Sequence, residues 1–422
     1  MFSLLKRLFE NKQPLKERLP FYEIVCPYCF SKFHHEDVVF RAAHYREDDE
    51  EFALQEDEPL NHYRAKFGLA PIDELEAIIE PSSVPDEQKI YANNVLMGIT
   101  DKYSILTRDR LCPGCHNDLP ITAGKYPSNI ISIVGATSVG KTVYMTTLIH
   151  TLQQMTANHF NAACIPLTTD ISRRFRINYE APLFENGRLL QSTEKTIRQE
   201  PFIFQFIFKN ENHPPLTLVF FDVAGEGMTD KDYLHLHAAH IKNSAGILFL
   251  VDPLQIRTIR DKLLYQLGEM PGEMAGQGDE PREVVISLFG DFIAHLEDSK
   301  TTIPTAVILT KSDLLHALKD RDGDYIGTNS NVFRPFTHRG YLDLDEYENI
   351  NGEMKRFLTK VDNPLVNALD VYFKEIAYFA VSALGSNPVN QQVNGIISSV
   401  RVDEPFIWLL YKLGYIEGRQ KE

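Results

Sequence analysis

Apolar runs of strand length alternate with segments of helical spacing from about residue 128 to the C-terminus. Runs that predict buried strands lie at 129–134, 202–208, 216–221, 245–251, 303–309 and 376–381. Helical spacing follows the first run and recurs at 254–268, at 283–298 and in the closing segment 405–413. This alternation is typical of an α/β protein with a mainly parallel, doubly wound sheet and flanking helices. The polar turn between the second and third runs predicts a hairpin, and hence one antiparallel strand in that sheet.

The first part of the chain lacks this pattern. Two Cys-x-x-Cys turns enclose a polar stretch in which eight of the twelve residues from Glu47 to Glu58 are acidic. Such a charge run favours a solvated or disordered loop over packed structure. We therefore predict two domains: a small module over 1–125 with an acidic insertion, and an α/β domain with insertions over 126–422.

The four paired cysteines are candidate ligands for a structural zinc ion. Each Cys-x-x-Cys turn presents two thiolates at a spacing that suits tetrahedral Zn²⁺, and four thiolates complete a closed site. A zinc-ribbon-like site of Cys26, Cys29, Cys112 and Cys115 is the first interpretation, with redox-active thiols as the alternative. Five cysteines in 422 residues argue against a disulfide framework and indicate a reducing compartment.

One motif predicts nucleotide binding. The run Gly135-Ala136-Thr137-Ser138-Val139-Gly140-Lys141-Thr142 fits the phosphate-loop pattern G-x-x-x-x-G-K-[ST]. It lies between a predicted strand and a predicted helix, which is the context that the motif requires. Backbone N–H groups of such a loop surround phosphates at the positive end of the helix. We expect Lys141 to reach the β- and γ-phosphates and the Thr142 hydroxyl to ligate Mg²⁺.

A second motif, D-x-x-G, follows the predicted strand 216–221. It begins with Asp222, and its carboxylate stands at the edge of the sheet where ligands bind in such folds. We expect Asp222 to hold Mg²⁺ through a water molecule and the Gly225 amide to approach the γ-phosphate, so that this loop senses hydrolysis. The next residue, Glu226, is a candidate to orient the attacking water or accept its proton, and the alternative is a solvated residue without a catalytic role.

Two motifs at later strand ends predict the base. Thr310-Lys311-Ser312-Asp313 follows 303–309, and the Asp313 carboxylate can accept from both N1–H and the 2-amino group of guanine. Adenine offers neither donor in that arrangement, so Asp313 selects guanine. Ser382-Ala383-Leu384 follows 376–381, and its backbone amide is expected to contact O6 of the base.

These four motifs in this order resemble those of the Ras-like, translation-factor-related class of P-loop GTPases, over roughly residues 128 to 420. With the N-terminal cysteine pairs, the chain is similar to bacterial double-GTPase proteins of conflict systems. The resemblance implies a P-loop NTPase G-domain fold, with GTP or GDP and Mg²⁺ as ligands. Four positions depart from the pattern of the class: Thr310 replaces Asn, Leu384 replaces Lys, Glu226 replaces Gln and Thr137 replaces Gly.

The resemblance also implies a threonine that ligates Mg²⁺ in the triphosphate state. The segment before the second strand must supply it, and Thr193 is our first choice, with Thr196 as the second. Binding of Mg²⁺ by this residue only when GTP is present would make the segment an order–disorder switch.

Charge and hydropathy limit the partners. The net charge of −15 leaves no basic excess for phosphate backbones, so no nucleic-acid partner is expected. The start of the chain, 1–9, has the spacing of a short amphipathic helix with a basic side, for which packing or fraying is expected rather than membrane contact. The sequence has no secretory signal and no apolar run long enough for a bilayer, so we predict a cytoplasmic protein.

The expected function is that of a slow GTPase acting as a nucleotide-dependent switch that recruits a protein partner, in a bacterial regulatory or conflict system. Its catalytic residues would be Lys141, Thr193, Gly225 and Glu226, and the zinc-bearing module would dock or regulate the partner. Two alternatives remain open: a scaffold that binds nucleotide without hydrolysing it, and a P-loop ATPase in which T-K-S-D occurs by chance.

Overall fold

A computed structural model gives the structure of the chain, and it divides into two compact units between Ser128 and Asn129. The structure describes residues 22–136, 138–190, 200–209, 213, 215–220, 241–268, 280–286, 300–320, 326–327, 329–386, 388, 392–393 and 395–420.

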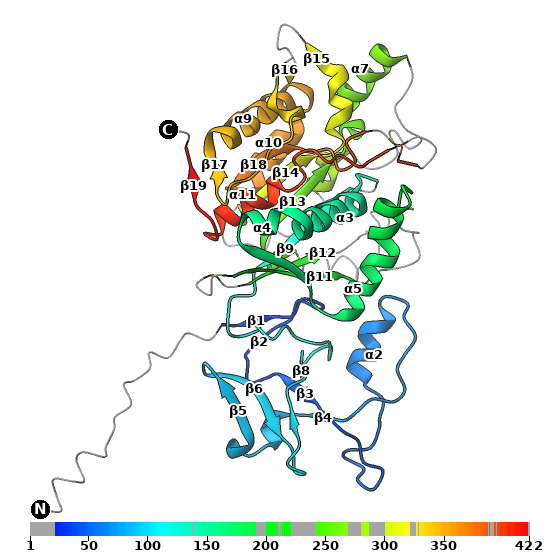
Figure 1. Ribbon diagram of the computed structural model, residues 1–422, viewed down its shortest axis with the longest axis vertical. Coiled ribbons are helices and arrows are strands. Elements are labelled where there is room, and N and C mark those ends of the chain that lie inside the picture. The colour runs from blue at the N-terminus through cyan, green and yellow to red at the C-terminus, as the bar shows by residue number, and fades with distance from the viewer. Residues whose placement is uncertain are drawn as a thin grey trace, which may run out of the picture. The chain divides into compact units, whose positions relative to one another are not determined.

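The second unit is built on a seven-stranded sheet in the order β10-β11-β12-β9-β13-β14-β18 (Figure 1). Its strands are β9 (Ile130–Gly135), β10 (Ala162–Pro166), β11 (Phe202–Phe208), β12 (Leu216–Phe220), β13 (Ser244–Val251), β14 (Thr305–Leu309) and β18 (Ile376–Ala380). The five strands from β12 to β18 in this order run parallel, whereas β11 is antiparallel to both of its neighbours. The predicted α/β class, the mainly parallel sheet and the β11–β12 hairpin are confirmed.

Helices connect and cover these strands. The α-helices are α3 (Lys141–Thr151), α4 (Ala157–His159), α5 (Thr169–Phe175), α7 (Arg257–Leu267), α9 (Leu344–Val361), α10 (Asn363–Tyr372) and α11 (Glu404–Lys412). Helix α3 continues as the π-helix η3 (Leu152–Thr156), and α5 continues as the π-helix η4 (Arg176–Glu185). Of the predicted helix 283–298, residues after 286 lie outside the described part of the chain.

Short elements complete the second unit. They are the 3₁₀ helices η6 (Pro253–Gln255), η7 (Ser312–Leu318) and η8 (Asn331–Phe333), and the strand pairs β15 (Lys319–Asp320) with β16 (Ile326–Gly327) and β17 (Leu342–Asp343) with β19 (Gly418–Arg419).

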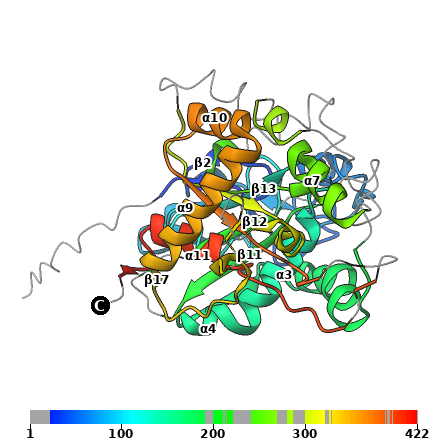
Figure 2. The same ribbon diagram turned by 90° about the horizontal axis from the view of Figure 1, so that it is seen from above.

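The closing helix α11 is a core helix, as its apolar sequence predicts. Residues 404–410 of this helix are all buried, and Figure 2 shows α9 beside it. Phe406 packs edge-to-face on Phe206 of β11 at 5.3 Å between ring centroids, and Trp408 packs on Phe379 of β18 at 6.0 Å. Because these contacts reach strands far apart in the sheet, α11 packs across it from β11 to β18.

Strand β10 is an edge strand that the sequence pattern did not predict. It is short and ends in Pro166, which has no N–H to offer to another strand. Gln153 Nε2 donates to the carbonyl oxygen of Cys164 at 3.3 Å, which occupies an outward acceptor of the strand. Both features blunt the edge against pairing with another chain. Cys164 itself is buried, as expected for a small apolar residue, and burial raises the pKa of its thiol to about 12.

The first unit is made of short strands around the cysteine turns. Its elements are β1 (Ile24–Val25), β2 (Lys32–Phe33), β3 (Val39–Arg41), α2 (Glu58–Ala65), β4 (Ile78–Ile79), β5 (Lys89–Ala92), β6 (Val95–Thr100), β7 (Leu106–Thr107) and β8 (Arg110–Leu111), with 3₁₀ turns η1 (Pro81–Ser83) and η2 (Asp86–Gln88). They pair as β1-β2, β4-β3-β8 and β5-β6-β7.

The acidic run is largely the solvated loop that its composition predicts, since six of its eight acidic residues are exposed, but two buried residues anchor it. Phe52 is only 6% exposed and stacks on His44 at 5.2 Å, and Asp57 is 4% exposed at the start of α2. The run packs because single apolar and capping residues within it find partners, while the neighbouring carboxylates stay in water. Composition over the whole run did not reveal these few anchors.

Candidate functional site

The carboxyl ends of four parallel strands meet at one edge of the large sheet. Gly135 of β9 is level with Leu250 of β13, while Leu309 of β14 is level with Val251 of β13 and with Ala380 of β18. The phosphate loop begins at the first of these paired residues, and T-K-S-D and S-A-L begin just beyond the others. The register of the sheet therefore brings the three motifs to one edge, beside the strand where its order reverses, which is where ligands bind in open α/β sheets.

The phosphate loop turns sharply from β9 into α3. Ser138 (φ 63°) and Gly140 (φ 85°) are left-handed, and Gly140 is the N-cap of α3. Lys141 is 8% exposed, and its Nζ donates to the carbonyl oxygens of Gly135 at 3.0 Å and Ala136 at 2.7 Å. A loop that holds an ammonium group at the N-terminus of a helix is suited to bind a phosphate group.

Thr310 joins the base motif to the phosphate loop. Its Oγ1 lies 3.1 Å from the carbonyl oxygen of Val139 and 3.3 Å from that of Val251, and it is 5% exposed. The hydroxyl proton has two acceptors within reach, one of them in the phosphate loop. Thr310, although its side chain is shorter than the Asn of the class pattern, therefore still links the two motifs.

Lys311 is held by a carboxylate that the sequence analysis did not single out. Lys311 is left-handed (φ 52°), and its Nζ lies 2.5 Å from Asp252 Oδ2. Asp252 is 4% exposed, and its other oxygen accepts from the Leu254 N–H at 2.9 Å. Asp252 directly follows β13, so the rule that drew attention to Asp222, a carboxylate just after a parallel strand, would have found it.

The predicted base carboxylate is positioned by the S-A-L motif. Ser382, which is 2% exposed, donates from Oγ to Asp313 Oδ1 at 2.6 Å. The Gly385 N–H donates to the same Ser382 oxygen at 2.9 Å, which orients the hydroxyl toward Asp313. Ala383 and Leu384 follow and are half-buried. A carboxylate oriented by a short hydrogen bond loses less entropy when it binds a base.

The four paired cysteines come together in the first unit. Their sulfur atoms all lie within 4.8 Å of one another, with 3.7 Å between Cys26 and Cys115 and 3.6 Å between Cys29 and Cys112. Zinc at about 2.3 Å from each sulfur of a tetrahedron requires S···S edges of about 3.8 Å, so the donor set fits Zn²⁺. A disulfide would need about 2.0 Å, and all four cysteines are free thiols.

The two cysteine turns share one backbone design. In each, the first cysteine N–H donates to the carbonyl oxygen five residues on, and its own carbonyl accepts from the N–H four residues on, at 2.9 to 3.0 Å. The residue four positions on is left-handed in both: Phe30 (φ 61°) and His116 (φ 49°). Hydrogen bonds from Cys115, Cys26 and Cys29 lower the pKa of the Cys112 thiol, whereas burial raises that of Cys26 and the Cys112 hydrogen bond raises that of Cys115.

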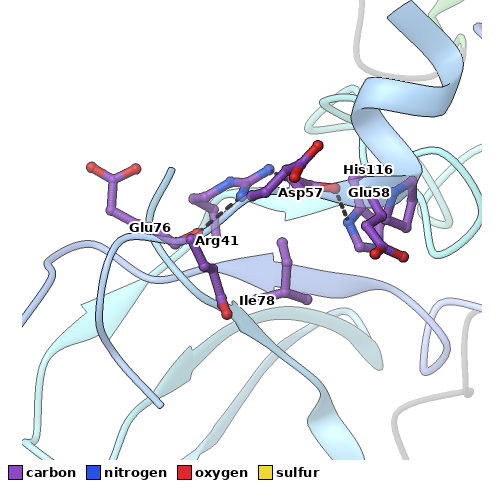
Figure 3. A pocket seen from close by; sticks show the side chains of 9 residues that line it. Arg41, Asp57, Glu58, Glu76, Ile78 and His116 are labelled. Atoms are coloured by element: carbon purple, nitrogen blue, oxygen red, sulfur yellow. Dashed lines mark hydrogen bonds and ion pairs between the residues drawn. The ribbon is translucent and has the colours of Figure 1, made fainter. Parts of the chain in front are cut away.

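A pocket of about 240 Å³ lies beside the second cysteine turn (Figure 3). Asp57 lies between Arg41 Nη2 at 2.6 Å and His116 Nδ1 at 2.8 Å, and accepts from the Leu60 N–H at 3.0 Å. Burial raises the pKa of Asp57, but the bonds from His116, Leu60 and Arg41 outweigh it, so the pKa is lowered. The acidic segment is thereby attached to the residue that follows Cys115.

Comparison with known proteins decides the family. A family model described as Double-GTPase 2 matches residues 129–383, more than half of the chain. This chain belongs to the Double-GTPase 2 family. The matched range begins just before β9 and includes the phosphate loop, D-x-x-G, T-K-S-D and the first two residues of S-A-L. The resemblance to P-loop GTPases of the double-GTPase type is thus confirmed.

A curated relative gives a second comparison. "Putative ESX-1 scaffolding and assembly protein SaeC" from Mycolicibacterium smegmatis is 27% identical over 331 residues, which cover 72% of this chain and 80% of the relative. The description concerns that protein.

Solved GTPases resemble the chain only distantly. The Arl6 small GTPase of Trypanosoma brucei is 11% identical, covering 68% of this chain and 98% of its own, with a TM-score of 0.28. Translation elongation factor SelB of Methanococcus maripaludis is 15% identical, covering 69% of this chain and 34% of its own, with a TM-score of 0.26. These TM-scores are too low to support an inference from the likeness.

Several predicted site residues of this family member fall outside the described part of the chain. They are Thr137, Thr193, Thr196, Asp222, Gly225 and Glu226. Thr142 is the second residue of α3 and is half-buried. No helix among the described residues is both long and apolar enough to cross a membrane.

Gly385 is expected to be intolerant of a side chain. It is left-handed (φ 79°), and a Cβ there would lie 2.1 Å from the carbonyl oxygen of Ser398. Gly385→Ala should lose about 1–3 kcal/mol from the backbone conformation alone, and more from the clash. Gly414→Ala is the matched control, because Gly414 is equally left-handed (φ 77°) but a Cβ there meets nothing within 4 Å. Thermal unfolding should show a larger loss of stability for Gly385→Ala than for Gly414→Ala. GTP titration should show a loss of affinity for Gly385→Ala and none for Gly414→Ala. Equal effects of both substitutions would refute the role of this close approach.

Proposed function

We propose that this protein is a GTP-binding switch that hydrolyses GTP slowly and recruits a protein partner when GTP is bound. Membership of the Double-GTPase 2 family supports it, because the family match spans the nucleotide motifs. The observation that carries the proposal is the pairing of Asp313 with Ser382 at the edge of the sheet that also bears the phosphate loop. We propose the cytoplasm as its location, where thiols stay reduced.

Each motif would have its own role in binding nucleotide and Mg²⁺. The loop from Gly135 to Thr142 holds the phosphates, with Lys141 on their outer oxygens. Thr142, Asp222 and Thr193 would hold Mg²⁺, which supplies positive charge to offset that of the phosphates, and Thr196 is the second choice for the last of these. Gly225 and Glu226 would detect the γ-phosphate and orient water. Turnover without activation would be slow, on the order of 10⁻⁴ to 10⁻² s⁻¹.

The partner would be a protein. SaeC is described as a scaffolding and assembly protein, which supports a role in recruitment for this relative of it. We propose that the module over 1–125, with Cys26, Cys29, Cys112 and Cys115 on one zinc ion, docks or regulates that partner, while 126–422 forms the GTPase domain. The pocket that Arg41, Asp57 and His116 help to line in the first unit supports such a role.

Removing the base carboxylate is the decisive test. Asp313→Ala is expected to lose about a hundredfold or more of its preference for GTP over ATP, because two hydrogen bonds to a charged group are removed. Asp261→Ala on α7, whose carboxylate is 62% exposed, is the control and should retain the preference. Competition binding of GTP, GDP and ATP with Mg²⁺, followed by phosphate release, measures both affinity and turnover. Equal ATP and GTP binding by the wild type would instead indicate a P-loop ATPase.

A nucleotide-bound scaffold without hydrolysis is the second candidate, favoured by the description of SaeC. Glu226 separates the two functions. If the wild type and Glu226→Ala both release phosphate no faster than background, with Mg²⁺ and K⁺ present, the scaffold is the better account. Turnover by the wild type that falls in Glu226→Ala supports the switch.

A further inference from the structure

The base-recognition loop depends on a second segment of chain that returns beside it. The Ser382 N–H donates to the Val400 carbonyl at 3.0 Å, and the Val400 N–H donates back to the Ser382 carbonyl at 2.8 Å. The Ser398 N–H also donates to the Leu384 carbonyl at 3.3 Å. Because the Ser382 backbone is fixed by this pairing, the aim of its hydroxyl at Asp313 depends on where Val400 lies.

The residue after Val400 is a buried arginine with a full set of partners. Arg401 is 4% exposed and binds both carboxylate oxygens of Glu404, at 2.8 and 2.9 Å. Its Nη2 donates to Glu346, and its Nε donates to the Asn331 carbonyl at 3.0 Å. Burial lowers the pKa of Arg401, but Glu404 and Glu346 more than compensate and raise it. The guanidinium is therefore charged and locked in one orientation.

These partners stand on the rigid parts of the second unit. Glu346 lies in the first turn of α9, and Glu404 begins α11, the helix that packs across the sheet. Arg401 itself is left-handed (φ 56°), a conformation that a long side chain keeps only when its surroundings over-determine it. The hydrogen bonds of Arg401 to α9 and α11 hold it in this conformation. They place the backbone of Arg401, and hence of Val400, at a fixed point.

We propose that Arg401 is a positioning residue for guanine recognition, which holds Val400 so that Ser382 aims the Asp313 carboxylate at the base. This inference rests on the proposed function, since it assigns a role within the proposed guanine site. Arg401 touches neither base nor phosphate in this account. Its effect passes through one backbone pair and one side-chain hydrogen bond.

The 2-amino group of guanine supplies the readout. Asp313 accepts from N1–H and from the 2-amino group, and the hypoxanthine base of ITP has the first donor but lacks the second. A misdirected carboxylate loses the second bond, so the GTP affinity falls toward the ITP affinity. A general loss of stability would weaken the binding of GTP and of ITP alike, and would leave the ratio of the two affinities unchanged.

The experiment compares Kd for GTP and ITP in the full-length protein with Mg²⁺. Arg401→Lys keeps the charge, but its single ammonium nitrogen cannot reach Glu404, Glu346 and the Asn331 carbonyl together, as the three nitrogens of the guanidinium do. We expect its preference for GTP over ITP to fall about tenfold, and Ser382→Ala to show the same fall. Should Arg401→Lys fail to fold, Glu346→Gln removes the negative charge of one anchor while Glu404 still pairs with Arg401, and a smaller fall is expected.

Controls separate the inference from stability and from the proposed function. Leu369 on α10 is fully buried, and Leu369→Ala should lower the melting temperature without changing the GTP to ITP ratio. The double variant Arg401→Lys/Ser382→Ala should lose no more of the ratio than Ser382→Ala alone, since both act through one hydrogen bond. With wild-type guanine preference intact, an unchanged ratio in Arg401→Lys, or additive losses in the double variant, overturns the inference alone. A wild type without guanine preference overturns the proposed function and this inference with it.

Discussion

Lys141→Ala is expected to lower the affinity for GTP by at least about a hundredfold. The Lys141 Nζ is held inside the phosphate loop by the carbonyl oxygens of Gly135 and Ala136. In the proposed complex it contacts phosphate oxygens, and each hydrogen bond to a charged group contributes about 1.5–3 kcal/mol. Alanine removes all of them together with the positive charge.

The fold should survive this substitution. Loss of the Lys141 donor leaves two loop carbonyls without that partner, which costs about 1–3 kcal/mol. Titration with a fluorescent GTP analogue measures the affinity, and thermal unfolding in the absence of nucleotide measures the fold. Lys355→Ala on α9, whose side chain is 48% exposed, is the control and should bind GTP like the wild type. Normal affinity in Lys141→Ala would show that nucleotide binds somewhere other than this loop.

Loss of the metal is expected to unfold the first unit while the second unit stays folded. Zinc bound to four thiolates contributes about 10–16 kcal/mol in small domains at neutral pH. The strands of the first unit are two to six residues long, so few backbone ladders remain to hold it without the cysteine site. We therefore expect one zinc per chain, and none in the variant Cys112→Ser/Cys115→Ser.

Elemental analysis and limited proteolysis test this expectation. In the double serine variant, cleavage should appear within residues 22–128, whereas GTP binding by the part from Asn129 onward should persist, because the two parts form separate compact units. Cys164→Ala is the matched control, since it removes a buried thiol outside the cluster and should keep the zinc. Thiols that form disulfides on mild oxidation, in a wild type that carries no metal, would support the redox alternative instead.

The strands of the large sheet could be predicted because each is a local pattern. The run from Phe202 to Phe208 is apolar at six of its seven positions, and burial of such a run needs no information from elsewhere in the chain. The phosphate loop could be predicted for the same reason, because its glycines and lysine must lie close together in the sequence to turn around a phosphate. Family membership followed from motif order, which is also a property of the linear sequence.

Other features needed contacts between distant residues. Strand β10 is short, ends in proline and owes its state to pairing with β11, so its own sequence carried little periodic signal. The ion pair of Asp252 with Lys311 joins residues 59 positions apart. The acidic segment packs because Asp57 finds Arg41 and His116, neither of which its charge density reveals.

The sequence by itself determined the family, the parallel α/β class, the phosphate loop and which four cysteines were candidates to share a site. Only the tertiary structure decided that Cys26 and Cys115, 89 residues apart, lie 3.7 Å from each other, and that Arg401 supports the loop of Ser382. The physical reason is that local spacing sets periodicity and turn chemistry. Hydrogen bonds and ion pairs instead depend on distances that the folded sheet and helices alone establish.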